Sequence, residues 1–330
     1  MCGIVGFFTG CKLAASCPKA RKNRDYTSAF RYWDEKATVR QAARREIDPN
    51  DENFHLFPKR FAPVSEHPLI LTKYPEKINT ILGLHLVRYM KFTQMLELVV
   101  VNDATRSVAL GQMPFDINRE MLLDAHRLYC DEAYHALFSA DIIEQVERLF
   151  GVASPNYVPS FLLQIRDTLA SHDNERQKFL LKLIFVIVSE MLITSNLKDV
   201  HKGGEMPQAV SDVMRDHAAD ESRHHVFYRE LLTQVWPQLS KQERLLWARH
   251  IPKFVSAFID PDEHAITSEL FMIGITKQDS QQILLDTYSG DNISSYKVQC
   301  ATQLLRALED LDIFHQAEYR EIFLEAGYSV

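Results

Sequence analysis

Apolar residues recur along most of this chain at intervals of three and four, which is the spacing of one face of an α-helix. The pattern predicts helical stretches over residues 25–46, 76–109, 116–150, 159–170, 174–197, 207–235, 240–258, 263–274, 277–288 and 292–326. The polar segment 48–75 contains several prolines and cannot hold a long helix. The sequence therefore predicts an all-α protein.

Two of the predicted helices carry an acidic residue inside an otherwise apolar run. Glu97 lies in Leu-Glu-Leu-Val-Val-Val, and Glu190 follows Val188 and Ser189 and precedes Met-Leu-Ile. Burial of an unpaired carboxylate costs several kcal/mol, so each of these acids needs a partner. A salt bridge at a helix end is the simplest such partner, and a metal ion is the alternative.

Two other predicted helices each carry an Asp-Glu-x-x-His motif, at Asp131–His135 and at Asp220–His224. Side chains three or four positions apart share one face of a helix, and His217, four residues before Glu221, lies on that same face. Imidazole nitrogen and carboxylate oxygen together suit iron or manganese. A third Glu-x-x-His, ending at His55, falls in the segment without a long helix, and we interpret it as a chance match.

The order of these residues is more specific than any one of them. A lone acid, a Glu-x-x-His, a second lone acid and a second Glu-x-x-His follow one another on successive long helices, as a dinuclear site in a four-helix bundle requires. The sequence predicts a ferritin-like bundle, similar to that of ribonucleotide reductase, with additional flanking helices. The predicted metal ligands are Glu97, Glu132, His135, Glu190, His217, Glu221 and His224.

The aspartates that precede the two motifs suit a supporting role. A metal-bound histidine usually donates its second ring N–H to a carboxylate. We expect Asp131 to accept from His224 and Asp220 to accept from His135, with Arg223 completing the network. His225 points about 100° away from the ligand face and is not expected to bind metal.

Composition narrows the classes of protein. The chain has 330 residues, 46% of them hydrophobic, with a net charge of −7 that argues against nucleic acid as the main partner. No window approaches 18 uninterrupted apolar residues, so no membrane span is expected, and no secretory signal is evident. Five cysteines without zinc-ribbon spacing fit a reducing cytoplasm.

The chain divides into a short head and one helical domain. Residues 1–24 show no clear period, and their Cys-Gly-Ile-Val-Gly start resembles that of class II glutamine amidotransferases, but no run of short strands follows. We expect residues 1–24 to form a head of unknown function. Residues 25–330 are expected to form a single oxygenase domain, with its metal-binding core at about 76–235.

The motifs and their order resemble the ferritin-like diiron N-oxygenases, the family that includes the 4-aminobenzoate N-oxygenase of aureothin biosynthesis. The third histidine, His217, separates this family from most other diiron proteins. The resemblance implies two iron ions, O₂ as co-substrate, and oxidation of a small biosynthetic amine to hydroxylamine, nitroso or nitro. It also implies a homodimer in secondary metabolism and an external electron donor, either a reductase or a ferredoxin. Manganese is possible in place of iron.

The substrate pocket is expected one helical turn from the ligands. Its candidate residues are Met90, Thr93, Leu128, Ser139, Ile187, Ile193, Thr194 and Met214. All are apolar or weakly polar, and no Arg or Lys clearly faces the ligands, although Arg88 and Lys91 are near. An arylamine and an amino-acid-derived amine both fit this lining.

Three other functions compete with amine oxidation. A diiron hydroxylase or desaturase would act on C–H bonds but would not account for His217. A small subunit of ribonucleotide reductase would need a tyrosine where Ser139 stands. A non-enzymatic iron-binding bundle is the third alternative. The sequence does not identify the amine, the final oxidation level, the electron donor or the oligomer.

Overall fold

The chain was analysed as a computed structural model that describes residues 26–50, 55–152, 157–197, 206–288 and 290–330. The side chains of 194–197 and 290–292 are not described. The head predicted for residues 1–24 lies outside these ranges, as does Glu52. Within them every regular element is a helix, so the all-α, ferritin-like fold is confirmed.

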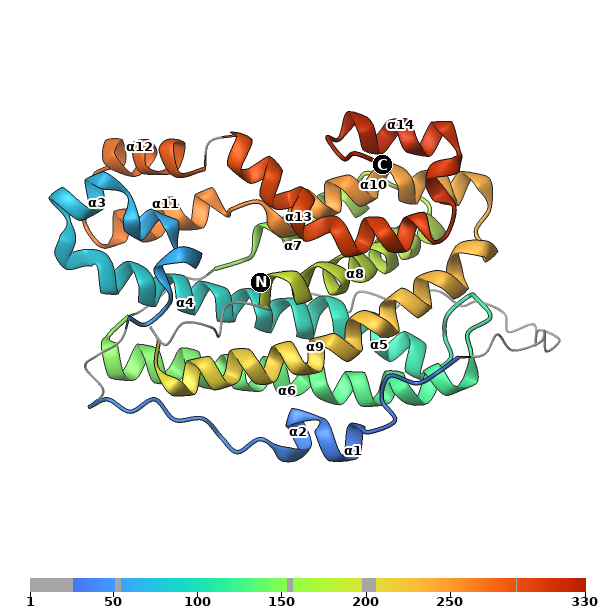
Figure 1. The fold of residues 1–330 in the computed structure, drawn as a ribbon, viewed down its shortest axis with the longest axis horizontal. Helices are drawn as coiled ribbons and strands as arrows, with labels where there is room; N and C mark the ends of the chain where they lie inside the picture. Colours follow the sequence, from blue (N-terminus) through green and yellow to red (C-terminus); the bar gives the residue numbers. More distant parts are fainter. Residues whose placement is uncertain (1–25, 51–54, 153–156, 198–205, 289) are drawn as a thin grey trace.

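Four long helical segments form the central bundle (Figure 1). Helix α6 packs along α4 and α5, helix α8 packs along α9, and α6 also meets α9. Their bounds are α4 Ile78–Met95, α5 Asn102–Ala109, α6 Arg119–Phe150, α8 Glu175–Leu197 and α9 Gln208–Val235. A π-helical turn, η4 (Leu96–Val101), joins α4 to α5 and makes them one continuous rod.

The boundaries of α6 show how local chemistry sets a helix. The predicted start at Asp116 is two residues early, because the Asn118 side chain accepts a hydrogen bond from the Glu120 amide at 2.8 Å and caps the helix. The predicted stop is confirmed: Gly151 ends α6 with φ of 65°, a left-handed conformation that glycine adopts without strain.

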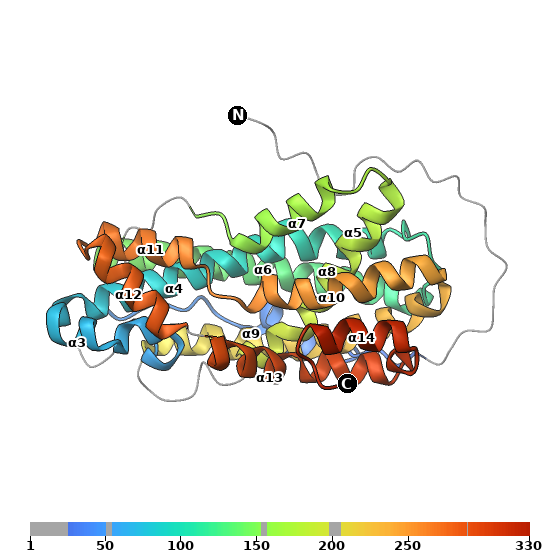
Figure 2. The same ribbon diagram turned by 90° about the horizontal axis from the view of Figure 1, so that it is seen from above.

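Additional helices cover the α8 side and both ends of the bundle. Helix α10 packs on α8, with α7, α13 and α14 around it. Figures 1 and 2 place α3, α11 and α12 together at one end and α14 at the other. Their bounds are α3 Pro68–Lys73, α7 Ser160–Ala170, α10 Lys241–Ile259, α11 Glu263–Met272, α12 Lys277–Thr287, α13 Gly290–Glu309 and α14 Ala317–Glu325. Short turns are η1 Lys59–Phe61, η2 Pro63–Glu66, η3 Pro75–Lys77, η5 Trp236–Gln238 and η6 Ile313–His315.

The helix predicted over residues 25–46 is wrong. Only α1 (Trp33–Lys36) and α2 (Thr38–Gln41) are helical there, separated by the extended Ala37. Residues 26–47, which we call the strap, instead run along α6 and α9 (Figure 1). Phe30, Ala37 and Ile47 of the strap are buried. The strap also forms hydrogen bonds to α6, through Tyr26, Trp33 and the Ile47 amide.

The helix predicted over residues 292–326 is two helices. Helix α13 ends at Glu309, and Asp312 takes a left-handed conformation with φ of 55° before α14 begins. The amphipathic pattern continues across this break because both helices pack on the same core. Among the described residues we find no helix with the length and continuous hydrophobicity needed to cross a lipid bilayer.

Candidate metal centre

The seven side chains singled out in the sequence converge at the middle of the bundle. The π-helical turn supplies Glu97, α6 supplies Glu132 and His135, α8 supplies Glu190, and α9 supplies His217, Glu221 and His224. Each is at most 1% exposed. No other group of three or more His, Cys, Asp or Glu side chains with metal-binding geometry occurs in the part of the chain that the structure describes.

These side chains form three overlapping groups. In each group the possible ligand atoms all lie within 4.8 Å of one another. The groups are Glu97, His135, His217 and Glu221; Glu132, His135, Glu221 and His224; and Glu97, Glu132 and Glu190. The two groups that contain histidine share Glu221 and His135, and adjacent groups with a shared carboxylate are the arrangement that a pair of metal ions needs.

The three imidazoles do not face the carboxylates with the same atom. Nδ1 of His135 lies 2.9 Å from Glu132 Oε2, and Nδ1 of His224 lies 2.9 Å from Glu132 Oε1. His217 presents Nε2 instead, 3.1 Å from Glu221 Oε1. Spacing along a helix fixes which face a histidine occupies but not which nitrogen points inward.

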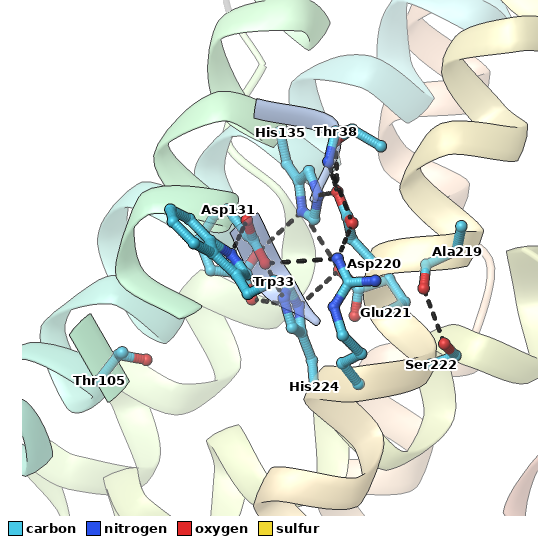
Figure 3. Close-up of polar contacts among 12 residues, drawn as sticks. Trp33, Thr38, Thr105, Asp131, His135, Ala219, Asp220, Glu221, Ser222 and His224 are labelled. Atoms are coloured by element: carbon cyan, nitrogen blue, oxygen red, sulfur yellow. Dashed lines mark hydrogen bonds and ion pairs between the residues drawn. The ribbon is translucent and has the colours of Figure 1, made fainter. Parts of the chain in front are cut away.

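The Nε2 atoms of His135 and His224 meet the two aspartates across the bundle. His135 Nε2 lies 3.2 Å from Asp220 Oδ2, and His224 Nε2 lies 3.2 Å from Asp131 Oδ2 (Figure 3). This is the pairing expected from the sequence. Arg223 contacts both acids, through a hydrogen bond to Asp220 and at 3.7 Å from Asp131.

The strap supplies two further partners that the sequence did not reveal. The indole Nε1 of Trp33 donates to Asp131 Oδ1 at 2.8 Å, and the Thr38 hydroxyl donates to Asp220 (Figure 3). These contacts span 98 and 182 positions of the chain. Each aspartate is therefore held between a histidine of the cluster and a residue of the strap.

Burial and mutual repulsion set the protonation of two carboxyls. Burial raises the pKa of Glu97 well above its usual range, and the neighbouring Glu132 and Glu221 carboxylates add to the shift. Burial likewise raises the pKa of Glu190, again with Glu221 and Glu132 adding to it. Without a metal, both effects favour the protonated form of Glu97 and of Glu190.

The pKa values of the other groups in the cluster shift in both directions. Burial lowers the pKa of His135, but hydrogen bonds that its ring donates to Asp220, Glu132 and Glu221 outweigh this effect and raise that pKa well above its usual range. For Glu221, burial raises the pKa, but His224 and the other imidazoles hold it well below its usual range. For His217, burial lowers the pKa and His135 adds to the effect. A neutral His217 is in the state that binds a metal.

The donor set fits two divalent ions. Neither oxygen of Glu97 or of Glu190 has a hydrogen-bond partner among the described residues, although both side chains are fully buried. A buried carboxylate without partners is strongly unfavourable unless a cation compensates it. Four carboxylates balance the charge of two divalent metal ions, and three imidazoles complete a nitrogen and oxygen set that suits iron or manganese.

The residues predicted to line a substrate pocket are almost all buried. Met90, Thr93, Leu128, Ser139, Ile187, Ile193 and Met214 are between 0% and 4% exposed, and the side chain of Thr194 is outside the described set. The hydroxyl of Ser139 has no hydrogen-bond partner among described residues. Their role as a pocket stays a prediction.

Two surface cavities lie on the strap side of the bundle and are lined by other residues. One, of about 320 Å³, lies beside Tyr134, Phe138 and Arg45. The other, of about 600 Å³, lies beside Arg31, Lys36 and Arg223. Phe138 separates the first cavity from the cluster, because its ring centroid is 5.3 Å from His135 and 5.5 Å from His217.

Three residues near the motifs do not belong to the cluster. The guanidinium of Arg88 forms a buried ion pair with Glu269 at 2.6 Å and is not free to hold a substrate. His55 contacts Asn79 at 2.8 Å, and it belongs to none of the metal-binding groups. His225, next to His224, is also absent from these groups.

Comparison with known proteins gives two matches. The family model described as P-aminobenzoate N-oxygenase AurF matches residues 30–312, most of the chain. A 4-aminobenzoate N-oxygenase from Streptomyces thioluteus is 21% identical over 221 residues. That alignment covers 66% of this chain and 66% of the relative, slightly less than two thirds of its length.

Proposed function

Because the chain belongs to the P-aminobenzoate N-oxygenase AurF family, we propose that it uses O₂ to oxidise the nitrogen of a small biosynthetic amine. The relative from Streptomyces thioluteus is named for 4-aminobenzoate, and this supports an amine as the substrate class here. The observation that carries the proposal is the convergence of four carboxylates and three imidazoles, all buried, at the centre of the bundle.

We propose that one iron ion is held by Glu97, His135, His217 and Glu221. The second iron ion is held by Glu132, Glu221 and His224. Glu190 of α8, which is grouped with Glu97 and Glu132, is proposed as a further carboxylate ligand of the pair. When bound, the two ions supply the electrons and coordination positions needed to activate O₂. Manganese fits the same donors but is the second choice.

The residues of this chain orient the ligands and keep water away. Asp220 and Asp131 hold the Nε2 protons of His135 and His224, so that the Nδ1 lone pairs face the carboxylates. The imidazole of His224 is covered by Phe30, whose ring stacks on it with centroids 6.0 Å apart. Exclusion of water strengthens the electrostatic attraction between carboxylates and metal ions and protects a reactive oxidant from side reactions.

The pocket that we propose accepts an amine whose remaining surface is mostly apolar. The predicted lining is apolar or weakly polar, and Arg88 is neutralised by Glu269. An arylamine without a carboxylate fits these walls better than 4-aminobenzoate or an amino-acid derivative with a free carboxylate, because a buried carboxylate would need a cationic partner. Both classes belong in the first substrate panel.

The decisive experiment is a single turnover. Protein loaded anaerobically with Fe²⁺ is exposed to ¹⁸O₂ with each amine, and the products are identified by mass spectrometry. The expected product carries ¹⁸O on nitrogen, and a Glu97→Ala variant should form none. Label on carbon alone would indicate a hydroxylase, and absence of any labelled product across the panel would contradict the proposal.

We further propose that the protein works as a cytoplasmic homodimer supplied with electrons by another protein. The homodimer is supported by the frequency of twofold symmetry among soluble oligomers. Conversion of an amine and O₂ into a hydroxylamine and water consumes two electrons and two protons. The electrons have to come from outside, because the sequence shows no flavin or nicotinamide fingerprint.

A further inference from the structure

The outer face of α6 carries a row of exposed apolar side chains. Leu123, Cys130 and Leu137 follow one another at intervals of seven residues, which keeps them close to one line along the helix. Leu123 is 54% exposed and Leu137 is 63% exposed. Around the helix, Cys130 lies about 160° from Glu132, a buried member of the metal-binding cluster. The row therefore faces away from the cluster.

Residues without charge occupy the neighbouring positions of this face. His126 and Ala133 are exposed, and Ala140 is half-buried. Together with the row they occupy the a and d positions of a heptad repeat, the pattern by which one helix packs along another. We call the six residues the α6 stripe: Leu123, His126, Cys130, Ala133, Leu137 and Ala140. None of them is Asp, Glu, Lys or Arg.

The charged residues beside the α6 stripe already have partners. Arg127 is paired with Asp124 at 2.7 Å, and Asp141, just past the end of the stripe, is paired with Arg44 at 2.9 Å. A second helix that packs on the stripe would therefore bury no unpaired charge, and it would remove the two exposed leucines from water.

The α6 stripe is complementary to itself. Leu123 and Leu137 stand seven residues on either side of Cys130. A twofold axis through Cys130, perpendicular to α6, would place Leu123 opposite Leu137 of the partner subunit, and the same contact would occur a second time by symmetry. The small side chains of Cys130 and Ala133 near the centre allow two helices to approach closely.

The same axis also matches the length of the helix. α6 begins at Arg119, eleven residues before Cys130, so a partner helix centred on Cys130 covers α6 as far as Asp141, eleven residues after it. The α6 stripe ends one residue before Asp141. Exposed charged residues resume only beyond the covered length, at Glu144, Glu147 and Arg148. The uncharged part of this face and the part that a second copy can cover therefore coincide.

We propose that the α6 stripe is the centre of the interface between two copies of this chain, with the twofold axis at Cys130. This inference rests on the homodimer proposed above, to which it adds the surface and the axis, and it does not depend on amine oxidation. Each copy uses the inner face of α6 for Glu132 and His135 and the outer face for its partner. The two metal clusters of the dimer would therefore lie back to back, on opposite sides of the paired helices.

A second copy fits this face better than a different protein. A protein of another sequence would have to present its own matching row of apolar residues, whereas a second copy supplies one by symmetry. Tyr129, which is exposed, and Tyr134, which is half-buried, flank the α6 stripe on its two sides. Tyrosine is enriched at protein interfaces, so both residues suit the border of this contact.

The surface is tested by sedimentation equilibrium of the full-length protein, which measures the dissociation constant of the dimer. Leu137→Glu places a charge against Leu123 of the partner subunit twice in each dimer, and it should weaken the dimer at least about 100-fold. Leu285→Glu is the matched control, because Leu285 is 70% exposed on α12, on the opposite side of the molecule from α6 in Figure 1. This control should leave the dimer unchanged. Circular dichroism should show both variants folded, since both positions are exposed.

A pair of opposite charges tests the antiparallel arrangement. In Leu123→Lys/Leu137→Glu each lysine would face a glutamate of the partner subunit, so the dimer should recover at least about tenfold relative to Leu137→Glu. In a parallel pair each position would face its own counterpart, and the same double variant would bring like charges together. Leu123→Glu/Leu137→Glu should remain monomeric in both arrangements.

Cys130 tests the position of the axis. Two cysteines can form a disulfide when their Cα atoms lie within about 7 Å of each other, and at the axis the two Cys130 residues would be neighbours. The protein for this test keeps Cys130 and has serine at the four other cysteines. Diamide, which takes two electrons and two protons from a pair of thiols, should link it into a covalent dimer on a non-reducing gel. Further change of Cys130→Ser should abolish the link.

The outcomes separate this inference from the proposed function. A dimer that Leu137→Glu leaves intact, equal effects of Leu137→Glu and Leu285→Glu, no recovery in the charge-pair variant, or no link through Cys130 would each overturn the inference. The homodimer itself would stand in all four cases. An unaltered protein that is monomeric would contradict both the homodimer and its interface. Failure of the iron-loaded protein to oxidise any amine would count against the proposed reaction and not against the α6 stripe.

Discussion

Asp220 of α9 lies 3.2 Å from Nε2 of His135, which belongs to α6. The reciprocal contact joins Asp131 of α6 to His224 of α9. Each of the two motif helices therefore orients the histidine of the other. Because the aspartate directly precedes the glutamate of the cluster in both motifs, one short sequence supplies both a proposed ligand and the partner of the opposite histidine.

The first prediction concerns these aspartates. Asp220→Asn and Asp131→Asn should each weaken metal binding by about 10- to 100-fold, because the imidazole loses the carboxylate that fixes its tautomer. Competition with a chelator measures the affinity. Asp216→Asn, one helical turn before Asp220 and paired with Arg45, is the matched control. Equal affinities in all three variants would show that the aspartates do not support the ligands.

The second prediction concerns the third histidine. His217→Ala should keep the helical fold, bind less iron and oxidise amine at least about tenfold more slowly, because one group loses its only α9 imidazole. Circular dichroism, iron analysis and product assays measure the three effects. His225→Ala, on the same helix but outside the cluster, should behave as the unaltered protein. Normal iron content in His217→Ala would exclude His217 as a ligand.

The third prediction is that metal reverses the dependence of stability on pH. Glu97, Glu190, His135 and His224 have pKa values raised by the fold, so their stabilisation is complete at low pH and is lost as pH rises. Glu221 and Glu132, with lowered pKa values, act oppositely only in acid. His217, whose pKa is also lowered, acts oppositely below the unfolded histidine pKa of about 6.5, but it is one group against four. The Tm of chelated protein should therefore fall between about pH 5 and about pH 8.

Metal-loaded protein should show the opposite trend, because metal binding displaces these protons and so strengthens as pH rises. Thermal unfolding in chelator and in excess Mn²⁺ compares the two states. Glu190→Gln removes one of the raised groups and should flatten the slope of the chelated protein. A Tm that rises with pH without metal would contradict the protonation described for the cluster.

The fourth prediction concerns the buried ion pair between Arg88 and Glu269. Arg88→Met should destabilise the protein by about 3–5 kcal/mol, because Glu269 would remain buried without its partner. Arg88→Met/Glu269→Gln should recover a large part of that loss. Urea unfolding measures both variants. Arg148→Met, which breaks an exposed pair with Glu144, should have a much smaller effect. Additive losses in the double variant would mean that the pair is not coupled.

The sequence predicts the ligand helices well because their signal is local. Glu97 and Glu190 stand out within apolar runs, and the spacing of the two motifs follows helical geometry. The sequence predicts the strap badly because its partners are distant: Trp33 contacts Asp131 and Thr38 contacts Asp220 only once the bundle has formed. Its apolar positions resemble those of an amphipathic helix, and tertiary hydrogen bonds override that preference.

The π-helical turn at Glu97 was likewise not predicted. Residues Leu96–Val101 are mostly β-branched or leucine and carry no local signal for a wider turn. Such turns occur often at functional sites, where they redirect one side chain within a helix. The wider turn lets Glu97 face the cluster while α4 and α5 both continue to pack on α6.

The strap has a consequence for how the protein matures. The strap donates hydrogen bonds to Asp131 and Asp220, and the same two carboxylates orient the histidines. Binding of the strap to the bundle and binding of iron should therefore favour each other to an equal extent. A freshly made chain that lacks iron should leave this segment open to proteases. Limited proteolysis would then measure the fraction of this protein in the cell that contains iron.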